Sequence, residues 1–233
     1  MRLLLLSNSR NPRGGWLDHA AGEIRDFLGP PRGTLLFFPF AAVTLGFDAY
    51  AAMARKRFAR MGYRLIGAHR ARASAARDAA AFVAGGGNTF RLLDEMQRRG
   101  WLAAVERASR AGKPYIGWSA GSNLACPSIR TTNDMPIAEP RSLAAMGLVP
   151  FQLNPHYTER SLARHGGETR DQRIAEFQAL NPGVKVLGLR EGSLLRLEGR
   201  RLELRLGPGA ELFSGSNRKK SFKAGSDLSF LLR

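Results

Sequence analysis

The stretch that decides the fold is Lys113-Pro-Tyr-Ile-Gly-Trp-Ser-Ala-Gly-Ser-Asn123. It opens with an apolar run over 115–118, which is typical of a buried strand, and it turns sharply at Ser119. Residues 117–121 carry the pattern Gly-x-Ser-x-Gly, which marks a nucleophile elbow when a strand precedes it and a helix follows. Such a turn lifts the serine hydroxyl clear of the sheet. It also places the N–H of Ala120, at a helix N-terminus, beside that hydroxyl as an oxyanion donor.

Strand and helix patterns alternate on both sides of this stretch. Apolar runs predict strands over 3–7, 34–38, 64–68, 82–84, 115–118, 148–153 and 184–189. Apolar residues at helical spacing predict helices over 16–28, 47–61, 74–81, 90–98, 102–110 and 168–180. Short runs over 193–197, 201–206, 211–213 and 228–232 are typical of antiparallel strands.

This order predicts an α/β fold. We expect a doubly wound, mostly parallel sheet with helices on both faces and antiparallel strands at the C-terminal edge. The chain shows neither a linker nor an internal repeat, so we expect a single domain over residues 1–233.

Composition and charge narrow the classes of partner. The formal net charge is +17, but the basic residues are scattered through every predicted helix, so we expect no nucleic-acid partner. A positive field would instead favour acidic small substrates. The apolar run over 3–6 is shorter than a signal peptide requires, and no run approaches a membrane span. The lone Cys126 suits a reducing compartment, so we expect a cytoplasmic protein with no membrane partner.

A serine needs a base to take its proton, and the base needs an orienting group. The chain holds four histidines, at positions 19, 69, 156 and 165. His156 is the favoured base, because it follows a short apolar strand and the rigid pair Asn154-Pro155. The orienting acid is either Asp134, in the loop after the elbow, or Glu191, which closes the strand over 184–189.

Three further features bear on the chemistry. The turn Gly85-Gly86-Gly87 follows a predicted strand and lacks the spacing of a dinucleotide or P-loop motif, so it is either a plain turn or a second oxyanion donor. Cys126 is expected to be a small core residue rather than a nucleophile. No histidine or cysteine cluster has metal-ligand spacing, so we expect neither a metal nor another cofactor.

Taken together, six motifs in order along the chain resemble those of the peptidase E family, the aspartyl dipeptidases. They are Gly85-Gly86-Gly87-Asn88-Thr89-Phe90, Gly117-Trp118-Ser119-Ala120-Gly121-Ser122-Asn123, Thr132-Asn133-Asp134-Met135-Pro136-Ile137, Asn154-Pro155-His156-Tyr157-Thr158, Gly167-Glu168-Thr169-Arg170 and Gly188-Leu189-Arg190-Glu191-Gly192-Ser193. The resemblance implies a fold akin to class I glutamine amidotransferases, which is flavodoxin-like, and hydrolysis of dipeptides with an N-terminal aspartate.

The resemblance also implies roles for single residues. Ser119 would be the nucleophile and His156 the general base. The N–H groups of Gly87 and Ala120 would form the oxyanion hole. Asp134 is favoured as the group that orients His156, because its loop can fold back over the site, and Glu191 is the second choice.

Arg170 would pair with the aspartate side chain of the substrate, since a guanidinium matches a carboxylate bidentately. Asn88, in the glycine-loop motif, is the other expected substrate-binding residue. The expected partner is therefore a small acidic dipeptide, and the expected assembly is a monomer or a homodimer. The alternatives are a cyanophycinase-like exopeptidase on β-aspartyl-arginine, an α/β-hydrolase-type esterase, and a binding module with an inactive triad.

Overall fold

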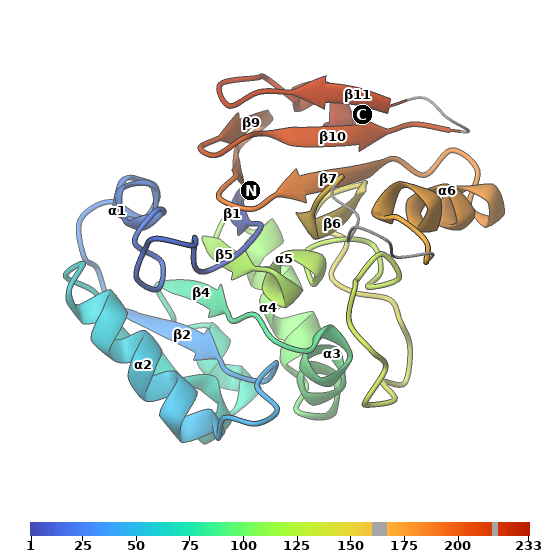
Figure 1. Cartoon of the computed structure of the whole chain (residues 1–233). Coiled ribbons are helices and arrows are strands. Elements are labelled where there is room, and N and C mark those ends of the chain that lie inside the picture. Colours follow the sequence, from blue (N-terminus) through green and yellow to red (C-terminus); the bar gives the residue numbers. More distant parts are fainter. Residues whose placement is uncertain (160–166, 216–218) are drawn as a thin grey trace.

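The computed structural model describes residues 1–159, 167–215 and 219–233 of the chain. His165 and Arg218 therefore lie outside the described residues. Within them, a larger and a smaller sheet form the framework, and helices cover the larger sheet on both faces (Figure 1). In this part of the chain no helix combines the length and the apolar character that a membrane crossing needs.

The larger sheet has the strand order β3-β2-β4-β5-β1-β8-β9. The five strands from β3 to β1 run parallel, whereas β8 and β9 pair antiparallel at the edge. This arrangement confirms the predicted mostly parallel sheet. The strands are β1 (Arg2–Leu6), β2 (Thr34–Phe38), β3 (Arg64–Gly67), β4 (Ala81–Ala84), β5 (Tyr115–Trp118), β8 (Leu194–Glu198) and β9 (Arg201–Arg205).

Alternate residues of these strands face opposite layers. Leu4 and Leu6 of β1 pack in a cluster with residues of helices α1 and α2, while Leu3 and Leu5 pack in a cluster with residues of α3, α4 and α5. Both faces of the central strands β1, β2, β4 and β5 are therefore buried, which is why these strands read as continuous apolar runs, whereas the edge strands β3 and β9 expose alternate residues. The helices are α1 (Ala21–Leu28), α2 (Phe47–Ala59), α3 (Thr89–Arg98), α4 (Trp101–Arg110) and α5 (Ala120–Asn123).

A second, four-stranded sheet with the order β11-β10-β7-β6 was not among the sequence predictions. Its strands β6 and β7 are parallel and its other pairs are antiparallel. Helix α6 (Arg170–Leu180) packs Ile174 against this sheet, and Figure 1 shows the helix beside β6 and β7. The strands are β6 (Gln152–Tyr157), β7 (Val186–Arg190), β10 (Ala210–Phe213) and β11 (Lys219–Phe222).

Four local predictions were wrong. The strand expected over 148–153, before His156, is β6, which begins at Gln152 and contains His156. The helix expected over 74–81 is only the 3-10 turn η2 (Ala73–Ala76), because the N–H of Ala80 already bonds the carbonyl of Thr34 as the chain enters β4. The strand expected over 228–232 is the 3-10 turn η3 (Ser229–Leu232), whose first N–H bonds the side chain of Asp227. The first helix begins at Ala21 rather than at 16; Leu17, with φ of 59°, cannot be helical. A further 3-10 turn, η1 (Ala68–Arg70), follows β3.

The elbow forms where β5 meets α5, and the two glycines are required by close backbone contacts. A Cβ at Gly117 would lie 2.4 Å from the carbonyl oxygen of Gly121, and a Cβ at Gly121 would lie 2.3 Å from that of Ala84. Between them Ser119 adopts φ of 53°. A non-glycine residue held in this region is strained, and such strain is typical of functional turns.

We predict that Gly121→Ala lowers the free energy of unfolding by about 1–3 kcal/mol, because the added methyl meets a rigid backbone carbonyl. The matched control is Gly22→Ala in α1, where a Cβ meets nothing within 4 Å. That change should leave stability unchanged or raise it by up to about 1 kcal/mol, since alanine favours helix. Denaturant unfolding measures both. Equal stability of the two variants would contradict the close approach at the elbow.

Candidate active site

Three side chains form a continuous hydrogen-bonded array at the junction of the two sheets. The Oγ of Ser119 lies 3.0 Å from Nε2 of His156, and Nδ1 of His156 lies 2.6 Å from Oε1 of Glu191. The serine follows β5, the histidine lies on β6 and the glutamate follows β7. Nucleophile, base and acid in this order can remove a serine proton and stabilise the resulting imidazolium.

The parallel pairing of β6 and β7 brings Glu191 to the histidine. Tyr157 lies opposite Arg190, and the register shifts between Pro155 and Tyr157. The irregularity falls at His156, whose φ is 55°. Because parallel strands end at one edge of a sheet, the first residue after β7 lies beside the end of β6.

The expectation that Asp134 contacts His156 is wrong. Its Oδ2 instead accepts hydrogen bonds from the N–H of Thr89 at 2.8 Å, from the Thr89 hydroxyl, and from the Thr132 hydroxyl at 3.0 Å. Thr89 is the first residue of α3, so the carboxylate lies at a helix N-terminus, where the dipole and free N–H groups favour an anion. The loop after the elbow was expected to bring Asp134 to His156, but it brings this side chain to the start of α3 instead.

Two backbone N–H groups adjoin Ser119. Ala120 is the first residue of α5, and its N–H has no hydrogen-bond acceptor within the described part of the chain. The same holds for Gly87, whose φ is 134° and whose added Cβ would lie 2.3 Å from the carbonyl oxygen of Ala41. A Cβ at Gly86 would lie 3.1 Å from the Cβ of Ser119, so the glycine loop packs directly against the serine.

Two aromatic side chains, Tyr50 and Trp118, hold the glycine loop at residues 85–87 in place. The hydroxyl of Tyr50 donates to the carbonyl of Gly86 at 3.1 Å, and Nε1 of Trp118 donates to the Tyr50 oxygen at 3.2 Å. Burial raises the pKa of Tyr50 to about 12, so this hydroxyl remains a donor at neutral pH. The chain Trp118–Tyr50–Gly86 therefore fixes the loop relative to the elbow strand.

Ser7 is a supporting residue to which the sequence analysis gave no role. Its buried hydroxyl accepts the N–H of His156 at 2.9 Å and donates to the carbonyl of Leu189 at 2.7 Å. One hydroxyl thus ties the strand that carries the histidine to the strand that precedes the glutamate. The available signal was its position, a polar residue directly after the apolar run of β1.

Arg170 is the first residue of α6. The preceding residue, Thr169, caps the helix together with Gln172. The Nη1 of Arg170 donates to Oδ1 of Asn133, which also accepts from Nδ2 of Asn154 at 2.8 Å. Partial burial, followed by the nearby charge of Arg173, lowers the pKa of Arg170. The Nδ2 of Asn133 in turn donates to the carbonyl of Pro155 at 2.8 Å, directly before His156. Asn133, another residue given no role from the sequence, therefore links Arg170 to the backbone of the histidine.

Arg170 also lines a cavity of about 200 Å³ beside this network. Its lining is predominantly polar and carries three guanidinium groups. The lining residues are Arg130, Thr131, Thr132, Asn133, Asp134, Asn154, Arg170, Arg173, Ile174 and Phe177.

Other candidate residues have structural partners. Asn88 caps α3 by accepting the N–H of Arg91 at 3.0 Å, and its Nδ2 donates to the carbonyl of Met135 at 2.8 Å, so substrate binding by Asn88 stays a prediction. Cys126 is buried, and burial raises the pKa of its thiol to about 12, as suits a core residue. Among the described residues, no group of three or more histidine, cysteine, aspartate and glutamate side chains could hold a metal ion.

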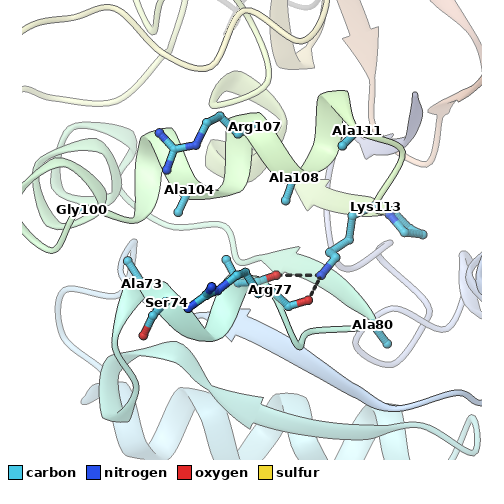
Figure 2. Close-up of a pocket in the computed structure, with 12 residues that line it drawn as sticks. Ala73, Ser74, Arg77, Ala80, Gly100, Ala104, Arg107, Ala108, Ala111 and Lys113 are labelled. Atoms are coloured by element: carbon cyan, nitrogen blue, oxygen red, sulfur yellow. Dashed lines mark hydrogen bonds between the residues drawn. The ribbon is translucent and has the colours of Figure 1, made fainter.

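A larger pocket, of about 760 Å³, lies between η2 and α4 (Figure 2). Within it, Nζ of Lys113 donates to the carbonyls of Ala76 and Arg77, both at 2.7 Å. Ala80 and Pro114 of its lining come shortly before β4 and β5 begin, whereas Ser119 follows the end of β5. This pocket is therefore at the opposite end of the strands from the serine.

Comparisons with known proteins find relatives over nearly the whole chain. The model of peptidase family S51 matches residues 3–205. A peptidase E of Streptomyces coelicolor is 47% identical over 235 residues, 100% of this chain and 95% of the relative. A peptidase E of a Nostoc species is 44% identical over 233 residues, covering 99% and 96%. A solved peptidase from an acI-B1 Actinobacterium superposes with a TM-score of 0.75 at 15% identity, covering 98% and 96%, and so shares the fold.

The array makes a prediction that needs no substrate. A fluorophosphonate should label Ser119, and Glu191→Gln should slow labelling about 10²- to 10⁴-fold, because the amide holds His156 in the wrong tautomer. Glu139→Gln, an exposed carboxylate on the loop that carries Asp134, is the control and should label at the wild-type rate. Unchanged labelling of Glu191→Gln, measured by intact-mass spectrometry, would contradict the geometry.

Proposed function

The chain belongs to peptidase family S51, and from this premise we propose that it is a serine-type dipeptidase that hydrolyses dipeptides with an N-terminal aspartate. The observation that carries the proposal is the array in which His156 lies 3.0 Å from Ser119 and 2.6 Å from Glu191. A serine peptidase requires these three roles. Their order along the chain, serine, histidine and then acid, differs from the serine, acid, histidine order of α/β-hydrolase esterases.

In the proposed reaction Ser119 attacks the peptide carbonyl while Nε2 of His156 accepts its proton. Glu191 stabilises the imidazolium at Nδ1. The N–H groups of Gly87 and Ala120 bind the oxyanion, each contributing about 3 kcal/mol to transition-state stabilisation. His156 then protonates the leaving amine. Water, activated by the same histidine, hydrolyses the acyl-enzyme and regenerates Ser119.

The preference for aspartate is assigned to Arg170. The Arg170 side chain is half-buried, lines the cavity that Asn133 and Asn154 also line, and is oriented by Asn133, whose side chain bonds the backbone directly before His156. A partly desolvated guanidinium binds a carboxylate more strongly than an exposed one, because less water competes. The net charge of +17 adds a field that attracts an acidic substrate.

Ser119→Ala is expected to abolish hydrolysis of Asp-Leu while leaving the thermal unfolding midpoint within a few degrees of wild type. The reason is that the change removes the nucleophile and a single oxygen at a half-buried position. Hydrolysis is followed by release of leucine, in the presence of a chelator. Full activity in this variant would refute the proposed function.

Arg170→Ala is expected to lower kcat/KM for Asp-Leu about 10- to 10²-fold, the effect of losing a hydrogen-bonded charge pair, and to change that for Ala-Leu little. Arg173→Ala is the matched control. Arg173 is three residues further along α6 and lines the same cavity, but it pairs with Glu168 at 3.5 Å. An unchanged ratio of the two substrates in Arg170→Ala would exclude Arg170 as the specificity residue.

A further inference from the structure

We propose that Asp134 binds the α-ammonium group of the substrate and so restricts the site to peptides with a free N-terminal residue. The inference rests on the proposed function and deepens it. It gives a role to a carboxylate that is held at the start of α3 and, among the described residues, makes no hydrogen bond to His156. It also names the part of the substrate that Arg170 leaves unrecognised.

The carboxylate of Asp134 is fixed through hydrogen bonds to one of its two oxygens. All three of its hydrogen bonds, from Thr89 N–H, Thr89 hydroxyl and Thr132 hydroxyl, fall on Oδ2. The other oxygen, Oδ1, accepts no hydrogen bond from any residue that the structure describes. The side chain is only partly exposed, so a rigidly oriented anionic oxygen is left free for a cationic ligand.

Asp134 and Arg170 line the same cavity of about 200 Å³, yet no ion pair of 4 Å or less joins these two described residues. Of the described residues that line this cavity, Asp134 is the one carboxylate, facing three guanidinium groups. A cavity with one fixed anion and a separate cation matches a zwitterion. The N-terminal aspartate of a dipeptide carries a side-chain carboxylate for Arg170 and an ammonium group for Asp134.

Chain connectivity limits the distance between the proposed oxyanion donor and the residue that holds Asp134. In the proposed mechanism Gly87 N–H holds the carbonyl oxygen of the scissile bond, and Thr89, two residues on, holds Asp134. Two residues of backbone span at most about 7 Å. The substrate's amino nitrogen is bonded to the carbon next to the scissile carbonyl, so it lies about 3–4 Å from that oxygen. One short loop therefore carries the proposed oxyanion donor and the residue that holds Asp134, which keeps the carboxylate near the end of the substrate that bears the ammonium group.

The same contact explains rejection of internal peptide bonds. An aspartate inside a longer chain presents a neutral amide and a preceding residue in place of the ammonium group. The Asp134 carboxylate would then lose its partner and part of its hydration, which costs binding energy.

The test compares two pairs of ligands whose members differ only in the α-amino group. Hydrolysis by wild type is measured with aspartyl p-nitroanilide and succinyl p-nitroanilide. Binding to Ser119→Ala is measured by calorimetry with Asp-Leu and succinyl-Leu. Wild type should favour aspartyl over succinyl p-nitroanilide about 10- to 10²-fold in kcat/KM. Ser119→Ala should bind Asp-Leu more tightly than succinyl-Leu by a similar factor. Asp134→Asn keeps an acceptor for Thr89. This change should remove most of the preference in kcat/KM and in affinity, because it weakens only the ligands that carry the α-amino group. The control Glu139→Gln should keep both.

Each other outcome contradicts the inference. Equal use of the two substrates by wild type overturns it without any variant. An equal loss on both substrates in Asp134→Asn, or no loss, shows a merely structural carboxylate. If wild type hydrolyses neither aspartyl p-nitroanilide nor Asp-Leu, the proposed function is refuted and this inference with it. Activity at equal rates on aspartyl and succinyl p-nitroanilide would refute this inference alone.

Discussion

The close approach of backbone at Gly117 and Gly121 is the constraint on which the rest of the site depends. Side chains at these positions would lie 2.4 and 2.3 Å from carbonyl oxygens of Gly121 and Ala84, so only glycine lets α5 begin directly against β4 and β5. That contact forces the turn at Ser119, with its positive φ, and leaves the first N–H of α5 without a hydrogen-bond acceptor among the described residues. The proposed nucleophile and the proposed oxyanion donor therefore follow from one packing requirement.

The second sheet supplies the rest of the array. Because β6 and β7 are parallel, their carboxyl ends present His156 and Glu191 side by side. Ser7, at the end of β1, bonds both strands and so joins this sheet to the larger one that carries Ser119. The catalytic geometry thus depends on how the two sheets meet. A change at the buried Ser7 is expected to act on His156 without touching substrate.

The sequence was enough to predict the parallel sheet from continuous apolar runs. It also singled out Ser119 and His156 as candidates, from an elbow and a strand end, and the structure brings these two side chains within 3.0 Å of each other. The sequence was not enough to choose between Asp134 and Glu191. Glu191 is 35 residues from His156 in the sequence and reaches it because β6 and β7 pair, whereas Asp134 is bound by the N–H of Thr89. A linear pattern encodes neither contact. The second sheet was missed for the same reason, since short strands such as β10 do not reveal their neighbours.

The central claim is that Ser119 forms a covalent acyl-enzyme. The most direct measurement is rapid acid quenching during turnover of an aspartyl p-nitrophenyl ester, followed by intact-mass and peptide mass spectrometry. Ester substrates make deacylation the slower step, so the intermediate should accumulate. The account predicts an aspartyl adduct on the peptide that contains Ser119 and none in Ser119→Ala. Turnover with no adduct, or an adduct on another residue, would contradict it.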